Sequence, residues 1–214
     1  MDRRHFTKAL LASTAGTVAG SAWSQAPAPV EGREYSRLEV PQTTNSPGKV
    51  EVLEFFSYAC PHCNTFEPEL EAWAGKLPPF VTLRRVPVPF LANVETFQRT
   101  YYALETLGLV ESMQRKVFQA VHSERLRLER IEDVAAVVGR HCGDATKFLA
   151  ACKSFSVAAS CGRAKKLTAD FGVVSYPGVP SLAIQGRFVT SPVQAGGGRQ
   201  ALAVTDFLIQ KVRA

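Results

Sequence analysis

Hydrophobic and polar positions follow strand spacing in the first part of the chain and helix spacing after it. The stretch 50–58 is rich in β-branched and aromatic residues, which predicts a strand buried on both faces, with Glu54 as an anomaly inside it. Phe66, Leu70 and Trp73 then recur at helix spacing, and Pro78 and Pro79 mark the end of that helix. The pattern predicts strands at 34–40, 50–58 and 80–86, a turn at 42–49 and a helix at 60–76.

From residue 93 to about residue 171 the apolar positions recur only at helix spacing. Breaks between these helices are expected near Gly108, Gly139 and Gly143. Strand spacing returns at 181–185 and 187–190, hinged at Gly186, and a last helix is predicted at 199–212 after a glycine-rich loop at 196–198. This order indicates an α/β fold that is interrupted by a block of helices.

The first 26 residues have the features of an export signal. Arg3 and Arg4 precede a run of small and apolar residues at 10–22, and small-residue cleavage sites follow. The run resembles a twin-arginine signal, although the general secretory route stays open, and an ordinary amphipathic helix is disfavoured by Pro27 and Pro29. No later stretch reaches the roughly 18 apolar residues of a membrane span. We therefore expect residues 1–26 to be cleaved and the mature protein to be soluble in the periplasm.

Composition narrows the possible functions. The chain has 214 residues, 46% of them hydrophobic, which suffices for one packed core with a sizeable insertion. The formal net charge of +6 is a mild bias, and no dense run of Lys and Arg with interleaved aromatic residues is present. A globular protein that does not bind nucleic acid is expected.

The candidate chemistry lies in Cys60-Pro61-His62-Cys63 at the start of the first predicted helix. Cysteines at i and i+3 share one helix face, with Cα atoms near the roughly 5.5 Å that a disulfide requires. The preceding strand should place Cys60 at the helix start, where free N–H groups and the imidazole of His62 favour its thiolate. Pro61 suits the first helical position, whose N–H has no partner. We expect Cys60 to be the nucleophile and Cys63 the resolving thiol.

Thiolate stabilisation favours the reduced pair and so makes its disulfide an oxidant, which suits an exported protein. One alternative is half of a zinc site, but the remaining ligands form no second pair at metal-ligand spacing. Another is a structural disulfide, although so short a loop constrains the unfolded chain little. We expect no metal and no cofactor. The scattered ligands are His122, His141, Cys142, Cys152 and Cys161.

Residues 53–63, the helical block and Gly178-Val179-Pro180 together resemble the DsbA family of periplasmic thiol-disulfide oxidoreductases. The resemblance covers about residues 32–213. It implies a thioredoxin fold with an inserted α-helical domain, with the thioredoxin-like domain at 33–90 and 172–214 and the helical insertion at 91–171. It also implies a dithiol oxidant of newly exported, cysteine-containing proteins, which a quinone-linked membrane oxidase reoxidises.

The resemblance assigns further residues to the site. Val179-Pro180 resembles the family's cis-proline loop, which faces the redox pair and leaves the Val179 backbone free to pair with a substrate peptide. Pro177 is a rival for a cis bond. Glu54 matches a buried family acid that can relay a proton to the resolving thiol, while alternation alone would allow a surface position. Glu67 matches another family acid, but a solvated helix face explains it equally well.

Cys142, Cys152 and Cys161 depart from the simplest family pattern. Three thiols in an oxidising compartment predict one extra disulfide and one free thiol, with all three pairings open. Buried, unpaired cysteines are the alternative.

The expected function is that of a monomeric dithiol oxidase. A disulfide isomerase or reductase is the nearest rival, although bond-shuffling relatives usually carry a dimerisation module, for which little chain precedes the first strand. A binding module is a rival of another class, either a thiol carrier for a soft metal or a peptide-binding chaperone.

Overall fold

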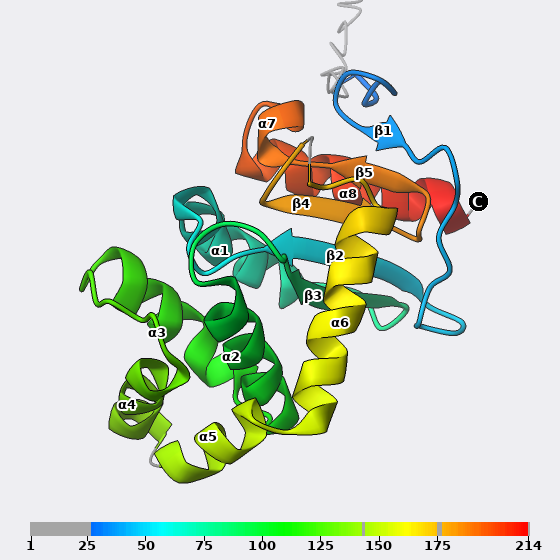
Figure 1. The fold of residues 1–214 in the computed structure, drawn as a ribbon. Helices are drawn as coiled ribbons and strands as arrows, with labels where there is room; N and C mark the ends of the chain where they lie inside the picture. Colours follow the sequence, from blue (N-terminus) through cyan, green and yellow to red (C-terminus); the bar gives the residue numbers. More distant parts are fainter. Residues whose placement is uncertain (1–26, 143, 175–176, 214) are drawn as a thin grey trace, which may run out of the picture.

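A five-stranded sheet with the strand order β1-β5-β4-β2-β3 forms the centre of the protein (Figure 1). The computed structural model describes residues 27–142, 144–174 and 177–213, so the predicted signal peptide lies outside the described residues. The strands are β1 (Ser36–Arg37), β2 (Val50–Phe56), β3 (Val81–Pro87), β4 (Ser181–Ile184) and β5 (Phe188–Thr190). The helices are α1 (Pro61–Ala74), α2 (Val94–Thr106), α3 (Val110–His122), α4 (Ile131–Cys142), α5 (Ala145–Cys152), α6 (Phe155–Asp170), α7 (Pro192–Ala195) and α8 (Gly198–Arg213).

The strand β2 lies inside the sheet and is buried along its whole length. It pairs in parallel with β3 and antiparallel with β4, and β4 in turn pairs antiparallel with β5. A strand with neighbours on both edges and layers on both faces needs apolar side chains in both directions, which explains why most residues of β2 are hydrophobic. The carboxyl end of β2 leads directly into α1 and so into the candidate redox motif.

Helices cover both faces of the sheet (Figure 1). On one face, α1 and α8 pack through Phe66, Leu70 and Leu208 against side chains of β2 and β4. On the other face, the helices α2 to α6 form the larger hydrophobic core. This three-layer arrangement holds α1, with its cysteines, firmly against the central strand.

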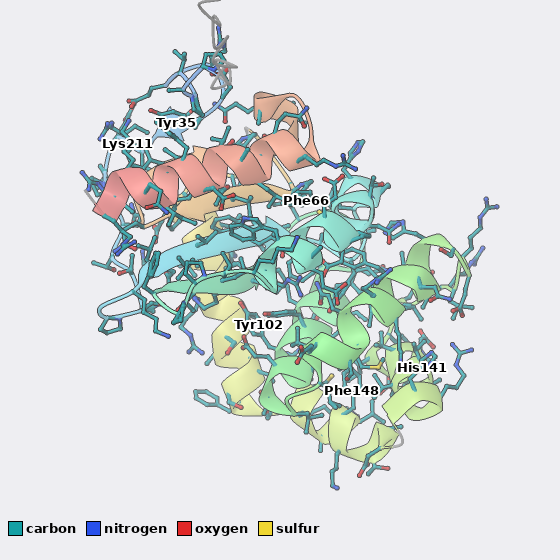
Figure 2. All side chains as sticks on the ribbon, turned by 180° about the vertical axis from the view of Figure 1, so that it is seen from behind. Tyr35, Phe66, Tyr102, His141, Phe148 and Lys211 are labelled. Carbon is teal, nitrogen blue, oxygen red and sulfur yellow. The ribbon has the colours of Figure 1, made fainter. Side chains whose placement is uncertain are left out.

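The helices α2 to α6 follow one another in the chain between β3 and β4. Phe148 lies within this block, and the long helix α6 returns the chain to the sheet (Figures 1 and 2). The prediction of a helical block inside an α/β fold is confirmed, while the division at residues 91 and 171 stays a prediction. None of the described helices combines the length and the apolar character that crossing a bilayer requires.

The prediction of a helix break at Gly139 was wrong. Gly139 does not interrupt a helix but lies inside α4, where a Cβ would stand 3.4 Å from the Cβ of Ala145, so the glycine permits close approach of α5. The short helix α7, which was not predicted, precedes the glycine-rich loop, and Ser191 caps it by accepting a hydrogen bond from the Gln194 N–H. The prediction near Gly143 falls on a residue outside the described ones.

Candidate active site

Cys60 occupies the N-cap of α1, as the sequence predicts. Its backbone is extended, Pro61 opens the helix, and the Cys63 N–H donates to Cys60 Sγ at 3.3 Å. Both cysteines are buried, Cys63 completely. The two thiols therefore lie on the same turn, with the sulfur of Cys60 held by the free N–H groups of the helix start.

The environments of the two thiols separate their acidities. A hydrogen bond from the Cys63 thiol, then the N–H groups of Cys63 and His62 and the charge of His62, outweigh burial and lower the pKa of Cys60 to about 6. Burial and the hydrogen bond to Cys60 raise the pKa of Cys63 well above its usual value. At neutral pH Cys60 is the thiolate and Cys63 the thiol. The side chain of His62 is exposed beside them.

The loop before β4 lies directly against the redox pair. Cys60 Sγ lies 3.5 Å from the Val179 carbonyl oxygen, and the bond between Val179 and Pro180 is cis, as predicted. Beside it, His62, Phe66, Pro180 and Val193 help to line a groove of about 260 Å³. The bond that precedes Pro177 involves a residue outside the described ones. The fold thus joins segments that are 119 residues apart in the sequence.

Glu54 and Glu67 share one buried cation. Arg85 Nε donates to Glu54 Oε2 at 2.8 Å, and Arg85 Nη2 donates to Glu67 Oε1 at 2.6 Å. The exposed fractions of Glu54 and Glu67 are 0% and 2%, so the surface alternatives for both are wrong. Burial raises the pKa of Glu54 to about 8 and raises that of Glu67. One guanidinium cannot neutralise two carboxylates in this setting, so the pair retains a proton at neutral pH.

Arg85 was not among the predicted site residues. It stands directly opposite Glu54 in the parallel register of β2 and β3. A charged residue inside the predicted strand 80–86 was the signal that could have indicated Arg85. Its partner, Glu54, can be identified only once the order of the strands in the sheet is known. Glu54 Oε1 is buried and has no hydrogen-bond partner, which leaves it able to accept or hold a proton.

The other cysteines remain apart from the redox pair. Cys152 is buried and Cys161 is half-buried. Both are free thiols, so no disulfide joins these two cysteines. The side chain of Cys142 lies outside the described residues. Burial raises the pKa of Cys152 to about 12 and also raises that of Cys161, which makes both thiols unreactive at neutral pH. Among the described residues, no group of three or more His, Cys, Asp or Glu side chains has metal-binding geometry.

Comparison with known proteins gives a consistent result. Residues 80–201 match the model of the DSBA-like thioredoxin domain. Over 199 residues the chain is 34% identical to the thiol:disulfide interchange protein DsbA of Burkholderia cepacia, with 92% of each protein covered. It is 36% identical to the DsbA of Azotobacter vinelandii over 214 residues, 99% of each. The chain belongs to the DsbA family.

The solved structures agree. The crystal structure of Pseudomonas aeruginosa DsbA superimposes with a TM-score of 0.80 at 34% identity, covering 86% of this chain and 95% of that one. The DsbA resemblance and the thioredoxin fold are therefore confirmed. As a DsbA family member the protein is a thiol-disulfide oxidoreductase that acts on cysteine-containing proteins.

Proposed function

We propose that this DsbA family member is a dithiol oxidant, in which the Cys60–Cys63 disulfide accepts electrons from the cysteine pairs of newly exported proteins. The observation that carries the proposal is the Cys63 N–H that donates to Cys60 Sγ at the first turn of α1. This contact stabilises the thiolate that forms when the disulfide is reduced. The more stable the reduced pair is, the stronger an oxidant its disulfide becomes.

The reaction takes two exchange steps. A substrate thiolate attacks Cys60 Sγ, a mixed disulfide forms, and the bond between Cys60 and Cys63 breaks. The second substrate thiolate then attacks the substrate sulfur, which releases Cys60 as a thiolate and leaves a substrate disulfide. Two electrons pass to the enzyme. Of the two substrate protons, one ends on Cys63 and the other in solvent.

Each side chain near the pair has a defined task in this scheme. Glu54, with one unpartnered oxygen beneath the pair, transfers the proton that Cys63 takes up. Pro61 starts the helix, and His62 adds positive charge near the thiolate. The backbone of Val179, held beside Cys60 by the cis bond to Pro180, pairs with the substrate peptide.

The size of the shift in the pKa of Cys60 supports an oxidant. With a pKa of about 6 instead of the usual 9.0, Cys60 is already ionised at pH 7. This difference favours the reduced form at pH 7 by about 1.4 kcal/mol, or about 30 mV for two electrons. Hydrogen bonds that the thiolate gains as the disulfide opens add to this value.

The cellular setting is proposed on the same grounds. An export signal at residues 1–26 would deliver the protein as a monomer to the periplasm, where unfolded proteins with reduced cysteines arrive. A quinone-linked membrane oxidase would then withdraw the two electrons from the reduced pair.

The decisive experiment is the redox equilibrium of the purified protein with glutathione, together with oxidation of a peptide that carries two thiols. We expect a potential above the roughly −270 mV of thioredoxin, and loss of peptide oxidation in Cys60→Ser. A potential near that of thioredoxin would instead favour a reductase. Absence of peptide oxidation in both the unaltered protein and the serine variant would favour a peptide- or metal-binding module.

A further inference from the structure

Three residues on one face of α3 contact the same residue of the loop that leads into the redox motif. The residues Ser57, Tyr58 and Ala59 connect β2 to the N-cap of α1. Gln114, Phe118 and His122 are spaced four apart on α3, which places them in one stripe along the helix. All three contact Tyr58, two residues before Cys60.

Two of these contacts hold the side chain of Tyr58. Its Oη donates to Gln114 Oε1 at 2.6 Å, and its ring meets the ring of Phe118 edge to face, with centroids 5.0 Å apart. Tyr58 is completely buried. The ring therefore cannot shift without losing a buried hydrogen bond and aromatic packing.

The third contact holds the backbone. His122 Nε2 lies 2.8 Å from the Tyr58 carbonyl oxygen. A carbonyl oxygen only accepts, so Nε2 carries the proton and donates. The imidazole also stacks on Phe118, with an interplanar angle of 27°, which fixes the orientation of the ring.

The peptide between Tyr58 and Ala59 is thereby fixed at both ends. His122 holds its carbonyl, and its N–H, on Ala59, donates to Ser57 Oγ at 3.1 Å. The next N–H, on Cys60, donates to the Ser57 carbonyl at 3.0 Å. These bonds set the direction in which the chain enters α1 and hence the position of Cys60 Sγ over the N–H of Cys63.

We propose that His122 is a positioning residue of the redox reaction. Through its hydrogen bond to the Tyr58 carbonyl it fixes the peptide that places Cys60 Sγ at the free N–H groups of α1. The inference rests on the proposed function, because it takes Cys60 as the attacked and attacking sulfur. It gives the helical insertion a part in the chemistry, since α3 reaches the loop that leads into the redox motif.

The test compares His122→Leu with His122→Gln, whose terminal amide can place a donor where Nε2 lies. In reduced protein, His122→Leu should raise the pKa of the Cys60 thiolate. It should also shift the equilibrium with glutathione toward the disulfide by about fivefold, the effect of one lost hydrogen bond. His122→Gln should restore both values. His141→Leu is the matched control, because His141 is an exposed histidine of α4, elsewhere in the helical block (Figure 2).

A second measurement needs no variant. Nitrogen NMR of His122 in the unaltered protein should show a proton on Nε2 throughout the range in which the imidazole is neutral. An unprotonated Nε2, or a folded His122→Leu whose thiolate pKa and glutathione equilibrium match those of the unaltered protein, would overturn the inference alone. An unlowered Cys60 pKa in the unaltered protein would instead refute the proposed function.

Discussion

Arg85 stands directly opposite Glu54 on the neighbouring parallel strand and donates to its Oε2 at 2.8 Å. The same guanidinium holds Glu67 on α1, so β2, β3 and the redox helix meet at one largely buried cation. Two carboxyl groups with one counter-charge titrate as a unit, and, besides burial, the charge of Glu54 raises the pKa of the Cys63 thiol. The charge of these two carboxyl groups therefore affects both the stability of the fold and the redox reaction.

Replacing Arg85 by methionine should strongly destabilise the protein. Two buried carboxyl groups would lose their cation, and we expect the free energy of unfolding at pH 7 to fall by about 3 to 5 kcal/mol. The loss should be smaller at pH 5, where both groups can protonate. Urea denaturation at the two pH values measures this. Arg130→Met, which removes an exposed ion pair with Asp133, is the control and should cost less than about 1 kcal/mol.

Glu54→Gln should flatten the dependence of stability on pH. The raised pKa means that folded Glu54 keeps its proton between about 4.5 and about 8, where the unfolded chain has lost it. The contribution of this group to stability is therefore largest below pH 4.5 and declines as the pH rises toward 8. We expect the variant to be about 1 to 3 kcal/mol more stable at pH 7. Equal pH dependence of the two proteins in chemical denaturation would contradict the raised pKa.

Ionisation of Cys60 should make the free energy of unfolding of the reduced protein depend on pH. The pKa of this thiol is about 6 when folded, below the roughly 8.5 of a free thiol, so its contribution is complete above pH 8.5 and is lost as the pH falls through 6. The difference in unfolding free energy between the reduced protein and Cys60→Ser should therefore grow between pH 6 and 8.5. Ultraviolet thiolate absorbance should titrate with a midpoint near pH 6, and a midpoint near 8.5 would refute the assignment.

Gly186→Ala should disrupt the hairpin between β4 and β5. The glycine has a φ of +61°, and a Cβ there would collide with the backbone carbonyl of Gln42. Neither the positive φ nor the collision can be relieved by a small shift of the backbone. We expect the free energy of unfolding, measured by thermal or urea unfolding, to fall by about 2 to 4 kcal/mol. Gly162 provides the contrast, because it is exposed on α6 and a Cβ there meets nothing within 4 Å. Gly162→Ala should gain about 0.5 to 1 kcal/mol.

Local information in the sequence was enough to predict most elements and the reactive pair. The mostly apolar sequence of β2 is the pattern of a strand buried on both faces, and cysteines three apart at a helix start face the same way. The prediction of a break at Gly139 was wrong because a glycine inside a helix signals close packing as readily as an end, and the difference depends on a neighbour, Ala145.

The chain by itself determined which residues are chemically reactive, because spacing and secondary structure place Cys60 and Cys63 on one turn. Only the tertiary structure decided what surrounds them. Strand register brought Arg85 to Glu54, sheet topology brought Val179 to Cys60, and the packing of α3 brought His122 to Tyr58. The physical reason is range: propensity and periodicity act over a few residues, whereas the burial and charge pairing that shift a pKa depend on groups far apart in the chain.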